Sequence, residues 1–230
     1  MTSAAAIIYE ASTWVLPVVF AVTLHEASHG LVAYQFGDDT AWRMGRVTAN
    51  PLKHIDRFGT IVLPALLLLA RSPFLFGYAK PVPVDFRRLR NPRRDMVWVA
   101  LAGPATNVLL AVLSAALLWP AALMPGQSAD WVATNLAHSI EINVVLCVFN
   151  MLPLPPLDGG RVAVGLLPNF LARPLARLER FGMLILILLL FVLPFVGEKL
   201  GLDLNIVARI ITGPSEALIR FVLAVTGQNQ

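Results

Sequence analysis

Two histidines and a glutamate lie within one apolar stretch near the start of the chain, in the segment TLHEASHG at residues 23–30. An α-helix advances about 100° per residue, so His25 and His29 would lie about 40° apart on one face and one turn apart in height. Their imidazoles could chelate one metal ion, and Glu26 could take a proton from a metal-bound water. The alternative is that these polar residues are hydrogen-bonded inside a helix bundle. The apolar surroundings favour a metal site, because burying ionisable groups in a membrane helix costs a few kcal/mol.

A third metal ligand is available in the segment NMLPLPPLDGGR at residues 150–161. Catalytic zinc sites typically use three protein ligands and leave one position open. The prolines of this segment cannot donate helical hydrogen bonds and should end the preceding helix, while the two glycines after Asp158 allow a tight turn. Asp158 could instead cap the helix that follows. Taken together with the two histidines, Asp158 is the better candidate for the third ligand, and we expect one zinc ion per chain.

The composition indicates the environment of these residues. Hydrophobic residues make up 57% of the 230 residues, charged residues only 14%, and the mean hydropathy is +0.70. Soluble domains contain roughly 25% charged residues, so the sequence predicts an integral membrane protein in contact with the lipid bilayer. The sequence pI of about 9.7 does not indicate nucleic-acid binding, because the basic residues lie mainly between apolar runs, where they anchor helices at the membrane surface.

Several apolar runs are long enough to form membrane helices. We expect an all-α polytopic membrane protein with five or six membrane helices and a small β element near the cytoplasmic membrane face. The run at 58–70 is short and contains Pro64, so we expect it to enter the membrane and return. We expect a single membrane-embedded domain over residues 1–230, with a catalytic core at about 5–170 and C-terminal helices at about 178–225.

The basic residues predict the orientation of the chain. No basic residue precedes Arg43, whereas basic residues are frequent at 43–95 and 161–180 and absent from the loop at 120–130. Cytoplasmic loops carry an excess of Lys and Arg. We therefore expect the N-terminus and the loop at 120–130 to lie outside the cell.

The sequence resembles the site-2 proteases, which are intramembrane zinc metalloproteases, here in a minimal form without a PDZ or CBS domain. Four stretches carry the resemblance: HEASH at 25–29, FGYAKPVPV at 76–84, LAGPATN at 101–107 and NVVLCVFNMLPLPPLDGGR at 143–161. The resemblance implies that His25, His29 and Asp158 bind zinc and that Glu26 is the catalytic carboxylate. It also implies cleavage of transmembrane helices of substrate proteins near the cytoplasmic side, in a bacterial or archaeal cell membrane.

Two further polar residues are candidates for the oxyanion site. Asn150, eight positions before Asp158, could donate a hydrogen bond to the scissile carbonyl or to the substrate backbone. His54, in a basic loop, is the second candidate. The alternatives are a packing amide for Asn150 and an interfacial histidine for His54.

The segment AKPVPV at 79–84 predicts an edge strand that pairs with an extended substrate. Pro81 and Pro83 each remove a backbone donor, which suits an edge, and a substrate helix must unwind before it is cleaved. The proposed pairing strand consists of Lys80, Pro81, Val82, Pro83 and Val84. The alternative is an extended connector.

The function that these features predict is an intramembrane zinc metalloendopeptidase whose partners are transmembrane proteins or peptides. Two alternatives use the same His and Glu cluster: an ion transporter, and a catalytically silent protein that binds membrane clients. The intact Glu26 beside both histidines argues against the silent protein. The sequence gives no indication of the oligomeric state.

Overall fold

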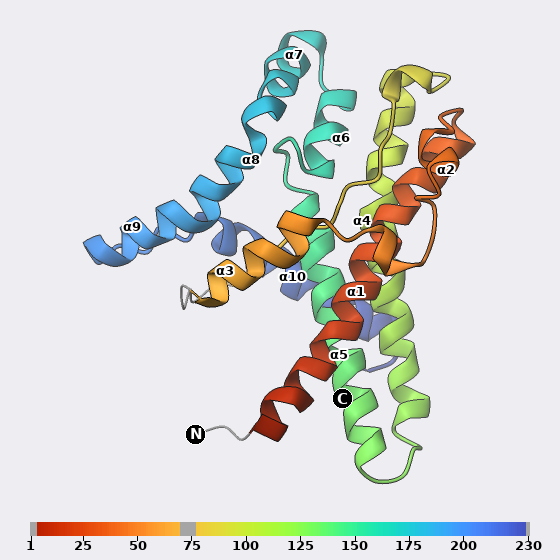
Figure 1. Ribbon diagram of the computed structural model, residues 1–230, viewed down its shortest axis with the longest axis vertical. Coiled ribbons are helices and arrows are strands. Elements are labelled where there is room, and N and C mark those ends of the chain that lie inside the picture. Colours follow the sequence, from red (N-terminus) through yellow and green to blue (C-terminus); the bar gives the residue numbers. More distant parts are fainter. Residues whose placement is uncertain (1–3, 70–76, 229–230) are drawn as a thin grey trace.

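Three long helices form the centre of the protein, α1 (Ala4–Gln35), α4 (Pro92–Ala121) and α5 (Gln127–Asn150). The computed structural model describes residues 4–69 and 77–228. The three helices pack against one another, and the start of α1 and the turn between α4 and α5 lie at the same end of the molecule (Figure 1). The opposite end of these helices carries the candidate metal ligands.

The remaining elements surround this centre. Helices α6 and α7 lie at the upper end in Figure 1, and α10 crosses behind α5 and packs on α4 and α5. The bounds of the shorter helices are Thr40–Arg43 for α2, Leu63–Leu69 for α3, Asp158–Leu166 for α6, Asn169–Arg177 for α7, Glu179–Ile187 for α8, Leu193–Leu200 for α9 and Ile206–Val225 for α10. Short 3-10 turns occupy Pro51–Lys53 and Phe86–Arg88, and π-helical turns occupy Arg57–Val62 and Leu188–Val192.

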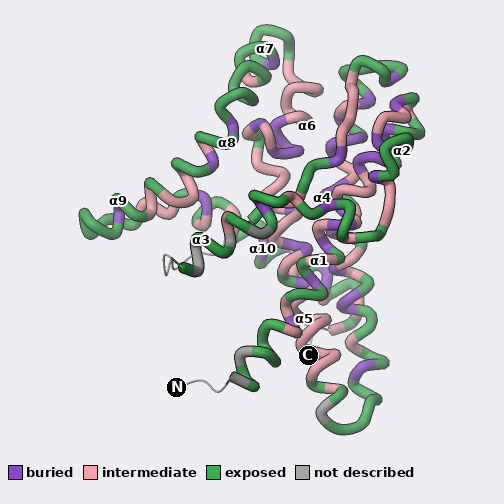
Figure 2. The backbone as a smooth tube through the Cα atoms, in the orientation of Figure 1, coloured by how far each residue is buried: buried purple, intermediate pink, exposed green. Residues whose placement is uncertain are grey.

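Four helical segments are long and apolar enough to cross a membrane, namely Ile8–Gln35, Pro92–Ala121, Ser128–Asn150 and Glu179–Leu200. Their large apolar side chains are often exposed (Figure 2). On α4, for example, Leu109, Leu113 and Leu117 are each about half exposed. Helices that are apolar on all faces are typical of membrane spans. The chain is therefore a multi-pass membrane protein.

The prediction of five or six spans was wrong for the described residues. The apolar run at 58–70 forms a π-helical turn followed by the seven-residue α3, and its last residue lies outside the described residues. The 13 residues of the two elements together cover roughly 20 Å, less than the roughly 30 Å of the hydrocarbon core. Helix α10 is longer but carries Arg209, Glu216 and Arg220, so it is too polar to count as a span by composition.

The predicted β element was also wrong, since residues 4–69 and 77–228 contain no strand. Residues 77–85 form neither a helix nor a strand, and their backbone bonds to separate groups of other segments instead of to a neighbouring strand. Lys80 N donates to the His54 carbonyl at 2.9 Å, and Arg46 Nη2 donates to the Lys80 carbonyl at 2.7 Å. With Pro81 and Pro83 unable to donate, too few backbone donors remain for a ladder.

Small buried residues bring the central helices together. Ala111 and Ala115 of α4 pack against Ile140 and Val144 of α5 and against Val222 of α10. Small side chains allow helix backbones to approach closely, which is how helices associate inside a membrane. This packing places the polar residues of α1, α4 and α5 within hydrogen-bonding distance of one another.

Candidate metal centre

His25, His29 and Asp158 converge at one point. The two Nε2 atoms lie 3.1 Å apart, and Asp158 Oδ2 lies 3.2 Å from His25 Nε2 and 3.4 Å from His29 Nε2. All three residues are buried, with at most 8% of each exposed. Two imidazole nitrogens and one carboxylate oxygen are a ligand set that zinc accepts. The helical spacing predicted for the histidines is confirmed, and Asp158 lies beside them.

The loop between α5 and α6 places Asp158 beside the histidines. Helix α5 ends at Asn150, before the three prolines, as predicted, and α6 begins at Asp158. A Cβ on Gly159 would collide with the backbone of Met151, and one on Gly160 would collide with the backbone of Pro155. The two glycines are therefore required for the close packing of α6 on the loop that precedes it.

The hydrogen bonds of the two imidazoles indicate which ring nitrogen faces the centre. His29 Nδ1 lies 2.7 Å from the Val99 carbonyl, and a carbonyl oxygen can only accept, so Nδ1 carries the proton. His25 Nδ1 lies 2.6 Å from Asn107 Oδ1, which is also an acceptor. In the neutral form of each ring, Nε2 then presents a lone pair to the centre, as a metal ligand must.

The orientation of Asn107 follows from a chain of buried amides. Asn143 Nδ2 donates to the Ser139 carbonyl at 2.8 Å, which leaves Asn143 Oδ1 to accept from Asn107 Nδ2, also at 2.8 Å. The Asn107 amide oxygen therefore faces His25. Asn107 and Asn143 are almost fully buried, at 0% and 1% exposure. We call this set of hydrogen bonds, from Ser139 through Asn143 and Asn107 to His25, the amide chain.

Two observations fit a cation at this centre. Asp158 Oδ2 is buried and accepts no hydrogen bond, although an unpaired buried carboxylate oxygen is costly. It also faces the lone pairs of two nitrogens, which would repel it unless a cation or a proton lies among them.

Gly103 of α4 leaves space for the two imidazoles. A Cβ at this position would lie 2.5 Å from His29 Nε2 and 2.6 Å from His25 Nε2. Such distances are far below van der Waals contact. The absence of a side chain at residue 103 therefore allows α4 to pack directly against the metal-ligating face of α1.

Glu26 is held by the extended segment instead of by the metal ligands. Its Oε2 accepts a hydrogen bond from Val82 N at 2.8 Å, and the Val82 side chain packs against Gly30, one turn further along α1. Val82 is 8% exposed. The segment predicted to pair with substrate therefore contacts the predicted general base directly.

Comparison with known proteins assigns the chain to a family. The family model of peptidase family M50 matches residues 13–126 and 120–193. The chain belongs to this family, the site-2 proteases. It is a membrane-embedded zinc metalloprotease.

Several curated relatives of this M50 protease carry names that agree with the site. It is 41% identical over 198 residues to "Putative zinc metalloprotease YwhC" of Bacillus subtilis, covering 83% of this chain and 85% of the relative. It is 32% identical over 176 residues to "Putative zinc metalloprotease Rip2" of Mycolicibacterium smegmatis, covering 75% of this chain and 64% of that relative. A relative from Methanocaldococcus jannaschii is 32% identical over 142 residues, with 60% and 62% covered. No solved structure matches this M50 protease.

The two oxyanion candidates lie apart from the converging ligands. Asn150 Nδ2 donates to the Leu146 carbonyl of its own helix at 3.0 Å. His54 is 3% exposed, and its Nε2 lies 3.1 Å from the Thr48 carbonyl. Among the described residues, neither side chain bonds to His25, His29 or Asp158. Their role in catalysis stays a prediction.

The sequence analysis did not anticipate the amide chain. Asn143, like the histidines, is a polar residue inside an apolar run, which could have marked it as a candidate. The segment LAGPATN at 101–107 places Gly103 and Asn107 on one face of α4. Their spacing of four residues places them one turn apart. Which polar residues of different helices meet depends on how the helices pack, and no local pattern in the sequence states that.

Proposed function

We propose that this M50 protease cleaves transmembrane helices of membrane proteins within the bilayer, near the cytoplasmic side. His25, His29 and Asp158 hold one zinc ion, and Glu26 is the catalytic base. The convergence of two nitrogen lone pairs on a buried carboxylate oxygen without a hydrogen bond carries this proposal. A zinc ion bound there would lower the pKa of a coordinated water toward about 7 and polarise the scissile carbonyl.

The side chains of this chain perform the remaining steps. Glu26 follows His25 directly on the same helix and accepts the proton of the attacking water, then delivers it to the leaving amine. Before substrate binds, the Val82 N–H holds one carboxylate oxygen of Glu26 at 2.8 Å. Asn150 or His54 would donate a hydrogen bond to the oxyanion after a rearrangement at the mouth of the site.

The extended segment at 80–84 would contact the unwound substrate. The N–H groups of Lys80 and Val82 are already bonded, to the His54 carbonyl and to Glu26. Substrate pairing at Val82 would therefore replace its bond to Glu26 at the moment when the carboxylate turns to the water. This exchange would couple substrate binding to the release of the base.

The orientation with the N-terminus outside is supported by the distribution of charge. Basic residues of α2, of the turn at 86–88 and of α7 gather at the end of the molecule opposite the start of α1 (Figure 1). An excess of basic residues marks the cytoplasmic side. The ends of α1 and α5 near the metal ligands would then face the cytoplasm. We propose one membrane-embedded domain with its catalytic core at about 5–170 and its C-terminal helices at about 178–225.

The test separates metal binding from catalysis. Glu26→Gln keeps the shape of the side chain and its bond to Val82 but accepts no proton. In proteoliposomes that contain a mixture of membrane proteins, the parent should release membrane fragments that the Glu26→Gln variant does not, while both keep zinc. Glu10→Gln, the same substitution at the far end of α1, is the matched control and should cleave like the parent. Cleavage by Glu26→Gln within about tenfold of the parent would refute the assignment of the base.

A further inference from the structure

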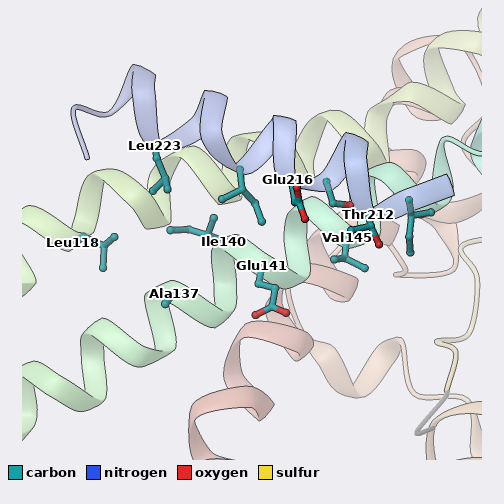
Figure 3. A pocket seen from close by; sticks show the side chains of 11 residues that line it. Leu118, Ala137, Ile140, Glu141, Val145, Thr212, Glu216 and Leu223 are labelled. Carbon is teal, nitrogen blue, oxygen red and sulfur yellow. The ribbon is translucent and has the colours of Figure 1, made fainter. Parts of the chain in front are cut away.

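A second concave site lies between α5 and α10, away from the metal centre. It is an open cavity of about 490 Å³ whose walls are mostly apolar. Figure 3 shows Ala137, Glu141 and Val145 on the α5 side, and Thr212 and Glu216 on the α10 side. We call it the α5–α10 groove. On each helix these residues recur at intervals of four, so the groove follows the helix axes for about two turns.

Glu141 is an ionisable residue near the middle of a membrane span. It lies thirteen residues after the start and nine before the end of the candidate span Ser128–Asn150, and its side chain is exposed. Within the part of the chain that the structure describes, it makes no hydrogen bond or ion pair. An unpaired carboxylate at this depth costs at least about 2.5 kcal/mol. Such residues mark a function by default.

Ser215 supplies a second, independent polar group without a partner. It lines the same groove, is 7% exposed, and its Oγ makes no hydrogen bond. A serine in a helix commonly bonds to the carbonyl four residues earlier, so an unpaired buried hydroxyl is unusual. Both Glu141 and Ser215 therefore offer hydrogen-bond acceptors to something that enters the groove.

The charges of the groove indicate what that partner carries. Glu216 lies 3.7 Å from Arg220 on the same helix, and both side chains are largely exposed. Arg220 pairs with Glu216, so Glu141 has no basic partner among the described residues. Acyl chains offer no hydrogen-bond donor, and lipid headgroups lie at the surface. A basic side chain carried by another membrane helix can reach this depth and pair with the carboxyl group.

We infer that the α5–α10 groove binds a transmembrane helix of another protein that carries an arginine or lysine near the bilayer midplane. The basic side chain pairs with Glu141, and Ser215 and Glu216 accept further hydrogen bonds from it. Ala137, Thr212 and Ser215 are small enough for the incoming backbone to approach closely. The metal ligands lie outside the groove, so this binding does not depend on the proposed proteolysis.

The binding test uses designed transmembrane peptides and the full chain carrying Glu26→Gln, which prevents cleavage. The peptides have about 20 apolar residues between lysine flanks, with either arginine or leucine at the centre. Energy transfer between labelled protein and peptide in liposomes reports binding. The arginine peptide should bind at least about tenfold more tightly than the leucine peptide. Equal binding of the two peptides would refute the inference.

Substitutions in the groove assign the effect to its residues. Adding Glu141→Gln should abolish the preference for the arginine peptide, Ser215→Ala should reduce it by a smaller factor, and Glu10→Gln on α1 should leave it unchanged. Zinc content equal to that of the parent shows that each variant is folded. A preference for the arginine peptide that survives Glu141→Gln would overturn the inference. Self-association of the protein that requires Glu141 and resists competition by the arginine peptide would also overturn it, because a second copy of the chain would then fill the groove.

Discussion

Asn143 and Glu141 lie two positions apart on α5, yet their surroundings differ completely. Two positions on a helix correspond to about 200°, so their side chains point to nearly opposite sides. Asn143 is 1% exposed and bonds to Asn107 and Ser139, whereas Glu141 is exposed and has no partner within the described residues. The amide chain satisfies its polar groups internally and orients His25, whereas Glu141 and Ser215 of the α5–α10 groove have no hydrogen-bond partner among the described residues.

This difference predicts opposite responses to substitution. A residue in the internally paired region cannot change without disturbing the metal ligands. Glu141 of the groove should be replaceable without loss of metal binding, since its side chain contacts none of the candidate metal ligands in the described residues. Substitutions around the metal centre should therefore lower zinc binding or cleavage, whereas a control variant for each should not.

The largest effect is expected at Gly103. The methyl group of Gly103→Ala would lie 2.5 Å from His25 Cε1 and from His29 Nε2, so the imidazoles or α4 must move. Zinc affinity, measured by competition with a chelator, should fall roughly 100-fold. Gly213→Ala on α10, where a Cβ would meet nothing within 4 Å, is the control and should keep full affinity. Equal zinc affinity of the two variants would show that the close approach of α4 is unimportant.

A smaller effect is expected for the amide chain itself. Asn143→Leu removes the side-chain hydrogen bonds of Asn143, so Asn107 Nδ2 keeps only its long bond to the Ala21 carbonyl at 3.4 Å. The Asn107 amide then fixes the proton on His25 Nδ1 less firmly. Zinc affinity should fall about tenfold, the scale typical of residues that orient metal ligands. Glu141→Gln, on the other face of the same helix, should leave zinc affinity unchanged. If both variants retain the affinity of the parent, the amide chain contributes only to packing.

The smallest effect is expected at the extended segment. Val82→Pro removes the N–H that donates to Glu26 Oε2 at 2.8 Å and touches no metal ligand. A hydrogen bond is worth roughly 0.5–1.5 kcal/mol, so the rate of cleavage should fall several-fold while bound zinc stays constant. Val82→Ala keeps the N–H and controls for the loss of the side chain. Parental cleavage by a folded Val82→Pro variant would leave the segment as a connector.

The comparison of Asn143 with Glu141 also shows what the sequence could predict. The spacing of His25 and His29 follows from helix geometry, and the prolines before Asp158 end α5 where expected. These are local properties of the chain. The candidate metal ligands and the membrane environment were therefore predictable from residue types, helical spacing and hydrophobicity.

The features that were missed depend on contacts between distant segments. Nothing near Asn143 in the sequence indicates that it meets Asn107, and nothing near Val82 indicates that it donates to Glu26. The strand predicted at 80–84 was wrong because its backbone groups bond to Glu26, His54 and Arg46. The span count was too high because the run at 58–70 is short and α10 is charged.

The most direct test of the central claim is the zinc content of the purified chain and of its Asp158→Ala variant. Asp158 is the ligand furthest in sequence from the two histidines, so its contribution depends entirely on the fold. Elemental mass spectrometry should find one zinc per chain in the parent. Asp130→Ala, which changes an exposed residue of α5, is the control and should also hold one zinc per chain. Asp158→Ala should hold only a small fraction of that amount, because three-ligand sites tolerate the loss of a ligand poorly. Full retention of zinc by Asp158→Ala would contradict the proposed metal centre.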